Sequence, residues 1–101
     1  MYNQKDATET VEIFTKALGV EEINTHNSWT DSSMTSAHFE LGELRGSATI
    51  ASHFAPGSIR VSVWRKGGDN NEIVRVTAPA AIALATVNMA IAQHSLDAAA
   101  K

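Results

Sequence analysis

The sequence predicts an α+β domain: a four-stranded antiparallel meander with one helix before it and one after it, in the order αββββα. Both ends of the chain show apolar residues at helical spacing, whereas the middle alternates apolar and polar residues at period two. Glycine, proline and asparagine cluster between the alternating runs, as they do in turns. The 101 residues, 44% of them hydrophobic, suffice for one domain over residues 1–101, with helices packed on one sheet face.

The N-terminal helix is predicted over residues 6–18, after a flexible arm at residues 1–5. Its apolar stripe consists of Val11, Phe14 and Leu18. Gly19 tolerates the left-handed backbone conformation that commonly ends a helix, so we expect the helix to stop there. Residues 20–33 are polar and rich in turn formers, which predicts a loop, either throughout or with one short strand.

Four alternating segments predict the strands of the sheet, namely residues 34–41, 46–54, 59–66 and 72–76. Their inward positions include Phe39, Ala48, Ile50, Phe54 and Val61, whereas Ala51 points outward. Residues 42–46 and 67–71 have turn composition. Between them, residues 55–58 contain proline followed by glycine, which predicts a type II turn.

The C-terminal helix is predicted to begin with Thr77 and Pro79, run to about Leu96 and fray over residues 97–101. It is unusual in having two opposite apolar stripes. One contains Leu84, Val87 and Ile91; the other contains Ile82, Ala85, Met89, Ala92 and Leu96. Only one stripe can face the sheet. The second either lies under the N-terminal helix or the long loop, or contacts another helix in a homodimer or a partner protein.

The outward face of the predicted sheet is a candidate binding surface. Alternation places a mixed set of side chains there: His38, Glu40, His53, Arg60, Ser62, Trp64, Lys66 and Arg75. A tryptophan among arginines has the composition of a protein-binding hot spot, so we predict that Arg60, Trp64 and Arg75, with His38 and His53, contact a partner. The alternative is that Trp64 packs on the arginine stems and covers a solvated sheet.

Several function classes find no support in the sequence. The absence of cysteine removes thiolate chemistry and fits a reducing compartment, so we expect a cytoplasmic protein. A zinc site at His38, Glu40 and His53 depends on an unknown register, and we predict no metal, no cofactor and no catalysis. No apolar run reaches the length of a membrane span. Residues 1–44 hold eight acidic and two basic residues, which argues against binding nucleic acid.

These features favour a non-enzymatic protein-binding module. In size, in the hairpin at residues 59–76 and in the helix at residues 77–96, the chain resembles small inhibitors encoded by phages and mobile elements, including anti-CRISPR proteins. That resemblance implies inhibition of a bacterial defence complex by contact. Two alternatives stay open: a small-ligand-binding or sponge protein with its pocket at a dimer seam, and an immunity-type protein directed against a toxin.

Overall fold

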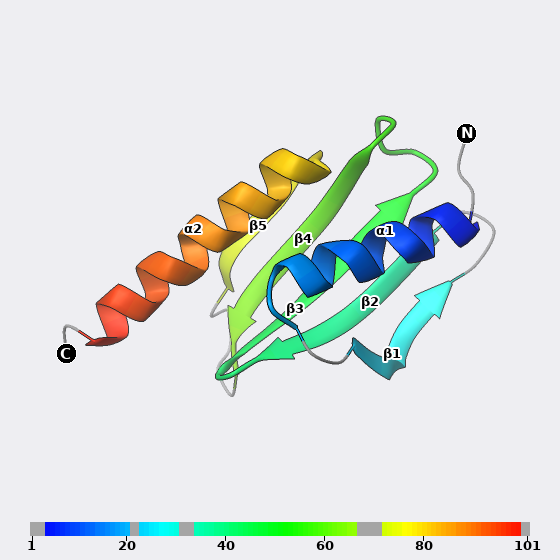
Figure 1. Cartoon of the computed structure of the whole chain (residues 1–101). Helices are drawn as coiled ribbons and strands as arrows, with labels where there is room; N and C mark the ends of the chain where they lie inside the picture. The colour runs from blue at the N-terminus through cyan, green and yellow to red at the C-terminus, as the bar shows by residue number, and fades with distance from the viewer. Residues whose placement is uncertain (1–3, 21–22, 31–33, 67–71, 100–101) are drawn as a thin grey trace.

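The computed structural model describes residues 4–20, 23–30, 34–66 and 72–99. In chain order its elements are α1 (Gln4–Ala17), β1 (Ile23–Thr30), β2 (Met34–Leu41), β3 (Leu44–Ala51), β4 (Ser58–Arg65), β5 (Glu72–Pro79) and α2 (Ala80–Ala99). The strands form one antiparallel sheet in the order β1-β2-β3-β4-β5, so each strand pairs with its neighbour in sequence (Figure 1). The predicted α+β class and meander are confirmed. The turn predicted at residues 67–71 lies outside the described residues.

All four predicted strands are present, and the sheet gains a fifth strand, β1, within the segment expected to be mostly loop. β1 pairs with the outer edge of β2, with Ile23 opposite Phe39 and Trp29 opposite Ser36, and its register shifts between these two pairs. Its sequence lacks the regular alternation of the other strands. An edge strand is stabilised by backbone hydrogen bonds to its neighbour, which residue-type propensity does not reveal.

Both helices lie on the same face of the sheet, as predicted (Figure 1). α1 packs over β2 and β3, whereas α2 packs along β5 and β4. The buried core between the two layers contains Val11, Phe14, Val20, Ala37, Phe39, Leu44, Ala48, Ile59, Val61, Val63, Ala83 and Val87. Complete burial of a valine or isoleucine side chain contributes roughly 1.5–3 kcal/mol, so this inward row supplies much of the free energy of folding.

A close contact in the sheet joins Phe39 on β2 to Gly46 on β3, which face each other across the strand pair. The Phe39 ring lies over the Gly46 backbone so closely that a Cβ atom at this position would overlap the ring. It would also come within 2.9 Å of the Ser62 carbonyl oxygen. Glycine is therefore required here for space, because the aromatic ring occupies the volume that a side chain would take.

α1 ends where the sequence predicts. Gly19 has a φ of 93°, and its amide donates to the Lys16 carbonyl over 3.0 Å. The Val20 amide donates to the Thr15 carbonyl over 3.1 Å, which completes a Schellman cap and turns buried Val20 into the core. The start of α1 differs from the prediction, since Gln4 and Lys5, expected in a flexible arm, already belong to the helix.

The β2–β3 hairpin is tighter than predicted. Leu41 pairs directly with Leu44, so the turn is Gly42 and Glu43 alone rather than residues 42–46. β3 consequently spans Leu44–Ala51 rather than residues 46–54, and Ala51 is buried although it was expected to point outward.

The turn between β3 and β4 agrees with the sequence in its central residues. Gly57 has a φ of 79°, and the Ser58 amide donates to the Ala55 carbonyl over 3.0 Å. Phe54 does not point inward from a strand, because it lies beyond the end of β3 and its ring contacts the guanidinium of Arg60.

The boundary between β5 and α2 also differs from the prediction. Thr77, Ala78 and Pro79 continue β5, in pairs with Arg60, Ile59 and Ser58 of β4, instead of opening the helix. The first amide of α2, that of Ala80, donates to the Gly57 carbonyl over 3.1 Å. α2 therefore begins at the alanine-rich run, which has high helix propensity, and extends to Ala99. Within the described ranges, neither helix has the length and apolar character needed to cross a membrane.

The Phe39–Gly46 contact predicts the effect of one methyl group. Gly46→Ala should lower the free energy of unfolding by about 1–3 kcal/mol, because the ring must move out of a packed core. Urea denaturation followed by circular dichroism measures this loss. Ser47→Ala, one residue further on the opposite sheet face, is the matched control and should change the value by less than about 0.5 kcal/mol. Equal stability of Gly46→Ala and the parent chain would contradict the packing described.

Candidate functional site

The sheet face opposite the helices, hereafter the open face, collects most of the side chains that the sequence marked for binding. Strand pairing sets them in rows: His38, Ser47, Ser62 and Arg75 form one row, and Glu40, Arg45, Trp64 and Glu72 form the next. A third row contains Ser36, Thr49, Arg60 and Thr77. Because side chains alternate between faces along a strand, these rows lie on the side away from the core.

Trp64 lies near one end of this face, on β4. It is half-buried, and its paired neighbours are Arg45 on β3 and Glu72 on β5. A bulge in β5 between the partners of Val63 and Trp64 leaves Ile73 as the extra residue. Bulges increase the local twist of a strand pair and redirect nearby side chains. The predicted hot-spot tryptophan is thus on the open face and partly accessible to a partner.

Apart from Arg60, the charged groups described on the open face form ion pairs with one another. The Glu40 carboxylate lies 3.3 Å from Arg45 Nε and 3.5 Å from Lys66 Nζ, and Arg75 Nη2 lies 3.0 Å from Glu72 Oε2. All these side chains are at least one-third exposed, so each pair contributes about 0–1 kcal/mol to stability. Such weak pairs can be exchanged for contacts with a partner at low cost in free energy.

Arg60 is held in place by two neighbours. Its Nε donates to the Thr77 hydroxyl over 3.1 Å, and its guanidinium carbon lies 4.9 Å from the centre of the Phe54 ring. A guanidinium at this distance from an aromatic ring gains about 0.5–1 kcal/mol at an exposed site. Both contacts orient the guanidinium before any partner arrives. A stretch of hydroxyls follows along the same row, where Ser36 and Thr49 share a hydrogen bond of 3.0 Å.

The two predicted histidines lie in different settings. His38 belongs to β2 on the open face, opposite Ser47, and is half-buried. His53 follows β3 in a turn, where its ring meets Phe54 edge-on at 4.7 Å between ring centres. The prediction that His53 is an outward residue of a strand is therefore wrong, although it lies near Arg60 through their shared neighbour Phe54. Within the described part of the chain, no three His, Asp or Glu residues are grouped as metal ligands.

The second apolar stripe of α2 is exposed. Ile82, Met89 and Leu96 have exposed fractions of 58%, 73% and 66%, and Ala85 and Ala92 beside them are exposed as well. The opposite side of the helix packs on the sheet through buried Ala83 and Val87. The sequence left open whether this stripe lies under the N-terminal helix. Because the stripe residues are exposed, α1 does not cover them.

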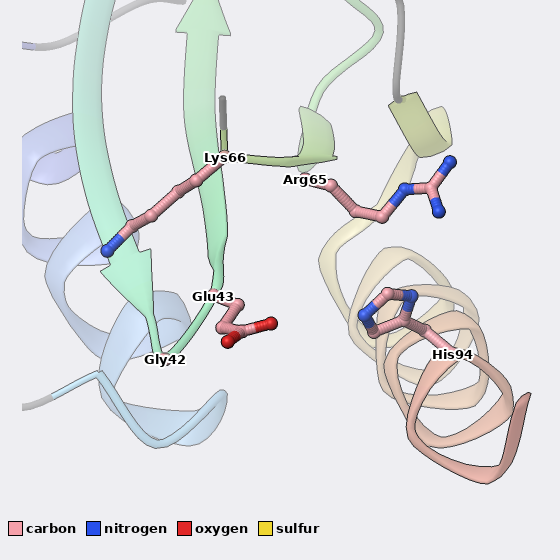
Figure 2. A pocket seen from close by; sticks show the side chains of 5 residues that line it. All are labelled: Gly42, Glu43, Arg65, Lys66 and His94. Carbon is pink, nitrogen blue, oxygen red and sulfur yellow. The ribbon is translucent and has the colours of Figure 1, made fainter. Parts of the chain in front are cut away.

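A pocket that the sequence did not indicate lies at one end of the molecule. It has a volume of about 470 Å³ and is lined by Gly42, Glu43, Arg65, Lys66 and His94, from the β2–β3 turn, the end of β4 and α2. Figure 2 shows Glu43 and His94 directed toward a common space. The Arg65 guanidinium extends past His94, and the Lys66 ammonium points away, consistent with its pairing to Glu40. Residues 42 and 94 are far apart in sequence, and only the position of α2 brings them together.

Comparisons with known proteins identify no relative: no family model, no curated protein and no solved structure matches the chain.

The shared role of Glu40 predicts a small, salt-dependent effect. Glu40→Gln should lower the free energy of unfolding by less than about 1 kcal/mol, because its two ion pairs are exposed. The loss should shrink further in about 1 M sodium chloride, where the screening length falls to about 3 Å. Glu43→Gln is the control, since no ion pair of Glu43 is found in the described ranges. A loss of several kcal/mol for Glu40→Gln would show that the face is a rigid structural network.

Proposed function

We propose that this protein is a non-catalytic protein-binding module whose contact surface is the open face, with Trp64, Arg60 and Arg75 as its main contacts. One observation carries the proposal: both helices pack on the opposite side of the sheet, and within the described residues this face has no covering element. Tryptophan and arginine dominate the energy of protein interfaces, and this face holds half-buried Trp64 with Arg45 beside it and the ordered Arg60 further along β4.

The mixture of charges supports a protein partner rather than a nucleic acid. Glu40 lies among the cations Arg45 and Lys66, and Glu72 lies beside Arg75. A phosphate backbone carries one sign of charge only, so the same carboxylates would repel it. A protein surface carries both signs, and an alternating pattern of this kind can select a partner by charge complementarity.

The order of Arg60 supports a preformed contact. Its hydrogen bond to Thr77 and its position over Phe54 fix the guanidinium on the rim of the face. A side chain that is already ordered loses less conformational entropy when it binds, and this saving amounts to about 0.5–1.5 kcal/mol for a long side chain. The guanidinium keeps further N–H donors for a carboxylate of the partner.

For the partner, the resemblance to phage-encoded inhibitors suggests a component of a bacterial defence complex, which the module would block by contact in the cytoplasm. An immunity-type protein would use the same face against a toxin. The defence inhibitor and the immunity-type protein differ only in their partner, so identification of the captured protein distinguishes the two hypotheses.

The proposal predicts a partner whose capture depends on Trp64. The tagged protein, incubated with bacterial lysate, should retain a stoichiometric protein that mass spectrometry identifies. Trp64→Ala should weaken its binding at least tenfold, or about 1.4 kcal/mol, with an unchanged circular dichroism spectrum.

Ile13→Ala is the matched control, because Ile13 is a large apolar residue with 69% exposure on α1, on the other side of the molecule. The affinity of the Ile13→Ala variant for the captured protein should equal that of the parent chain. Binding that survives Trp64→Ala, or that fails equally with Ile13→Ala, would exclude the open face as the contact surface.

The pocket of Figure 2 favours a second candidate function, the binding of a small ligand. It is an open depression of about 470 Å³ whose lining is mostly exposed and charged. His94 offers an N–H donor to a carboxylate or phosphate, and Glu43 offers an acceptor to an amino group, so the chemistry fits a small metabolite bearing both groups.

This candidate predicts a thermal shift. Amino acids and nucleotides, screened singly, should include one that raises the unfolding temperature, since a ligand at 100 times its Kd adds about 2.7 kcal/mol of stability. His94→Ala should abolish the shift, and Trp64→Ala should leave it unchanged. A screen without a shift, or a shift that His94→Ala retains, would remove the pocket as a ligand site.

A further inference from the structure

The apolar surface of this protein is concentrated on its helices. In the described part of the chain, the large hydrophobic residues that are exposed are Ile13, Ile82, Met89 and Leu96. Three of these four belong to α2 and, with Ala85 and Ala92, follow one side of that helix. We name these five α2 residues, from Ile82 to Leu96, the α2 stripe. Contiguous exposed apolar surface of this kind marks a site of association.

The α2 stripe also lacks charge. Residues 80–96 contain no aspartate, glutamate, lysine or arginine, although the other helix, α1, contains several charged residues. A helix exposed to water on one side ordinarily carries charged residues there. The surface that binds this stripe is therefore expected to be apolar, because α2 offers it no charged side chain between positions 80 and 96.

The spacing and sizes of the stripe residues indicate what that partner is. The residues recur at intervals of three and four, the pattern of a helix–helix seam. Large residues occupy positions 82, 89 and 96, and alanine occupies positions 85 and 92 between them. Large and small side chains thus alternate along the seam.

This alternation is complementary to itself when two copies run antiparallel. In a parallel pair, equivalent positions meet, so Met89 would face Met89 and alanine would face alanine. In an antiparallel pair, the two sets of seam positions face each other, and each large side chain meets a small one. Interdigitation of large with small residues fills the space between two helices without voids. In a dimer with a two-fold axis between the helices, both copies contribute the same surface patch to the interface.

We propose that the α2 stripe is a homodimer interface, in which α2 of one copy packs antiparallel on α2 of a second copy with Met89 near the two-fold axis. The stripe spans about 21 Å from Ile82 to Leu96, given a rise of 1.5 Å per residue. One helix face of this length falls well short of the ~800 Å² per partner of a standard interface. The dimer is therefore weak and forms in a concentration-dependent way.

The proposed dimer leaves the open face untouched. The stripe points away from the sheet on the helix side of the molecule, and the open face lies on the other side of the sheet (Figure 1). Dimerisation would place the two open faces outward, so one dimer could hold two partners. The inference does not depend on the proposed partner binding, and each can fail without the other.

Sedimentation velocity over a range of concentrations tests the proposal. The parent chain should shift from monomer to dimer as concentration rises, and Met89→Glu should raise the dimer Kd at least about tenfold. Ile13→Glu, an equally exposed apolar residue on α1, should leave the Kd unchanged. A parent chain that stays monomeric up to about 1 mM would overturn the proposal, as would equal effects of the two substitutions.

Disulfide cross-linking tests the antiparallel orientation. Because the parent sequence contains no cysteine, any disulfide must form between the introduced residues. When chains are mixed, Met89→Cys should form a disulfide-linked dimer with Ala85→Cys or Ala92→Cys under mild oxidation, because the antiparallel seam sets position 89 against an alanine of the second copy. Ile82→Cys lies at one end of the stripe and should not cross-link to itself, because its equivalent in the partner lies at the far end. Efficient cross-linking of Ile82→Cys to itself would establish a parallel pair and contradict the antiparallel seam.

Discussion

The burial of a single face of the sheet is the constraint on which the rest of the structure depends. The inward row on β2, β3 and β4 is apolar and almost completely buried, and the two helices are the elements that cover it. Both helices must therefore lie on one side. The Phe39 ring lies over Gly46 within this core, and any larger residue at position 46 would displace the ring. The open face is the direct consequence of this one-sided packing.

One-sided packing also determines the properties of the two candidate surfaces. The residues that alternate with the inward row point to the open face, which is mostly polar. Its ion pairs join Glu40 to Arg45 and Lys66 across strands, and Glu72 to Arg75 within β5. α2 needs only one of its two apolar stripes to complete the core, through Ala83 and Val87. The other stripe stays exposed on the opposite side of the molecule, so contact with a partner protein and contact with a second copy are compatible.

Sequence periodicity predicted the parts of the fold that depend on burial. Alternation identified β2, β4 and most of β3, and Gly19 and Gly57 marked a helix end and a turn that the structure confirms. Alternation also placed Arg60, Trp64 and Arg75 on one face. The strand register sets them in three successive rows, so that none of the three is paired directly with another.

The features that the sequence did not predict depend on contacts between distant segments. β1 forms because the edge of β2 offers backbone partners, and Thr77 remains in β5 because it pairs with Arg60, although Thr77 and Pro79 have the composition of a helix start. The pocket between Glu43 and His94 arises from the direction of α2 relative to the β2–β3 turn, which no local pattern encodes.

Mapping of the partner's footprint by NMR shows whether the open face is the contact surface. The ¹⁵N-labelled protein would be titrated with its captured partner, and changes in amide and indole chemical shift would be placed on the sheet and helices. Binding through the open face requires the largest changes at Ser62, Trp64, Arg75 and their cross-strand neighbours, with the outer sides of α1 and α2 unaffected. Changes concentrated on the α2 stripe, with the open face unchanged, would contradict it.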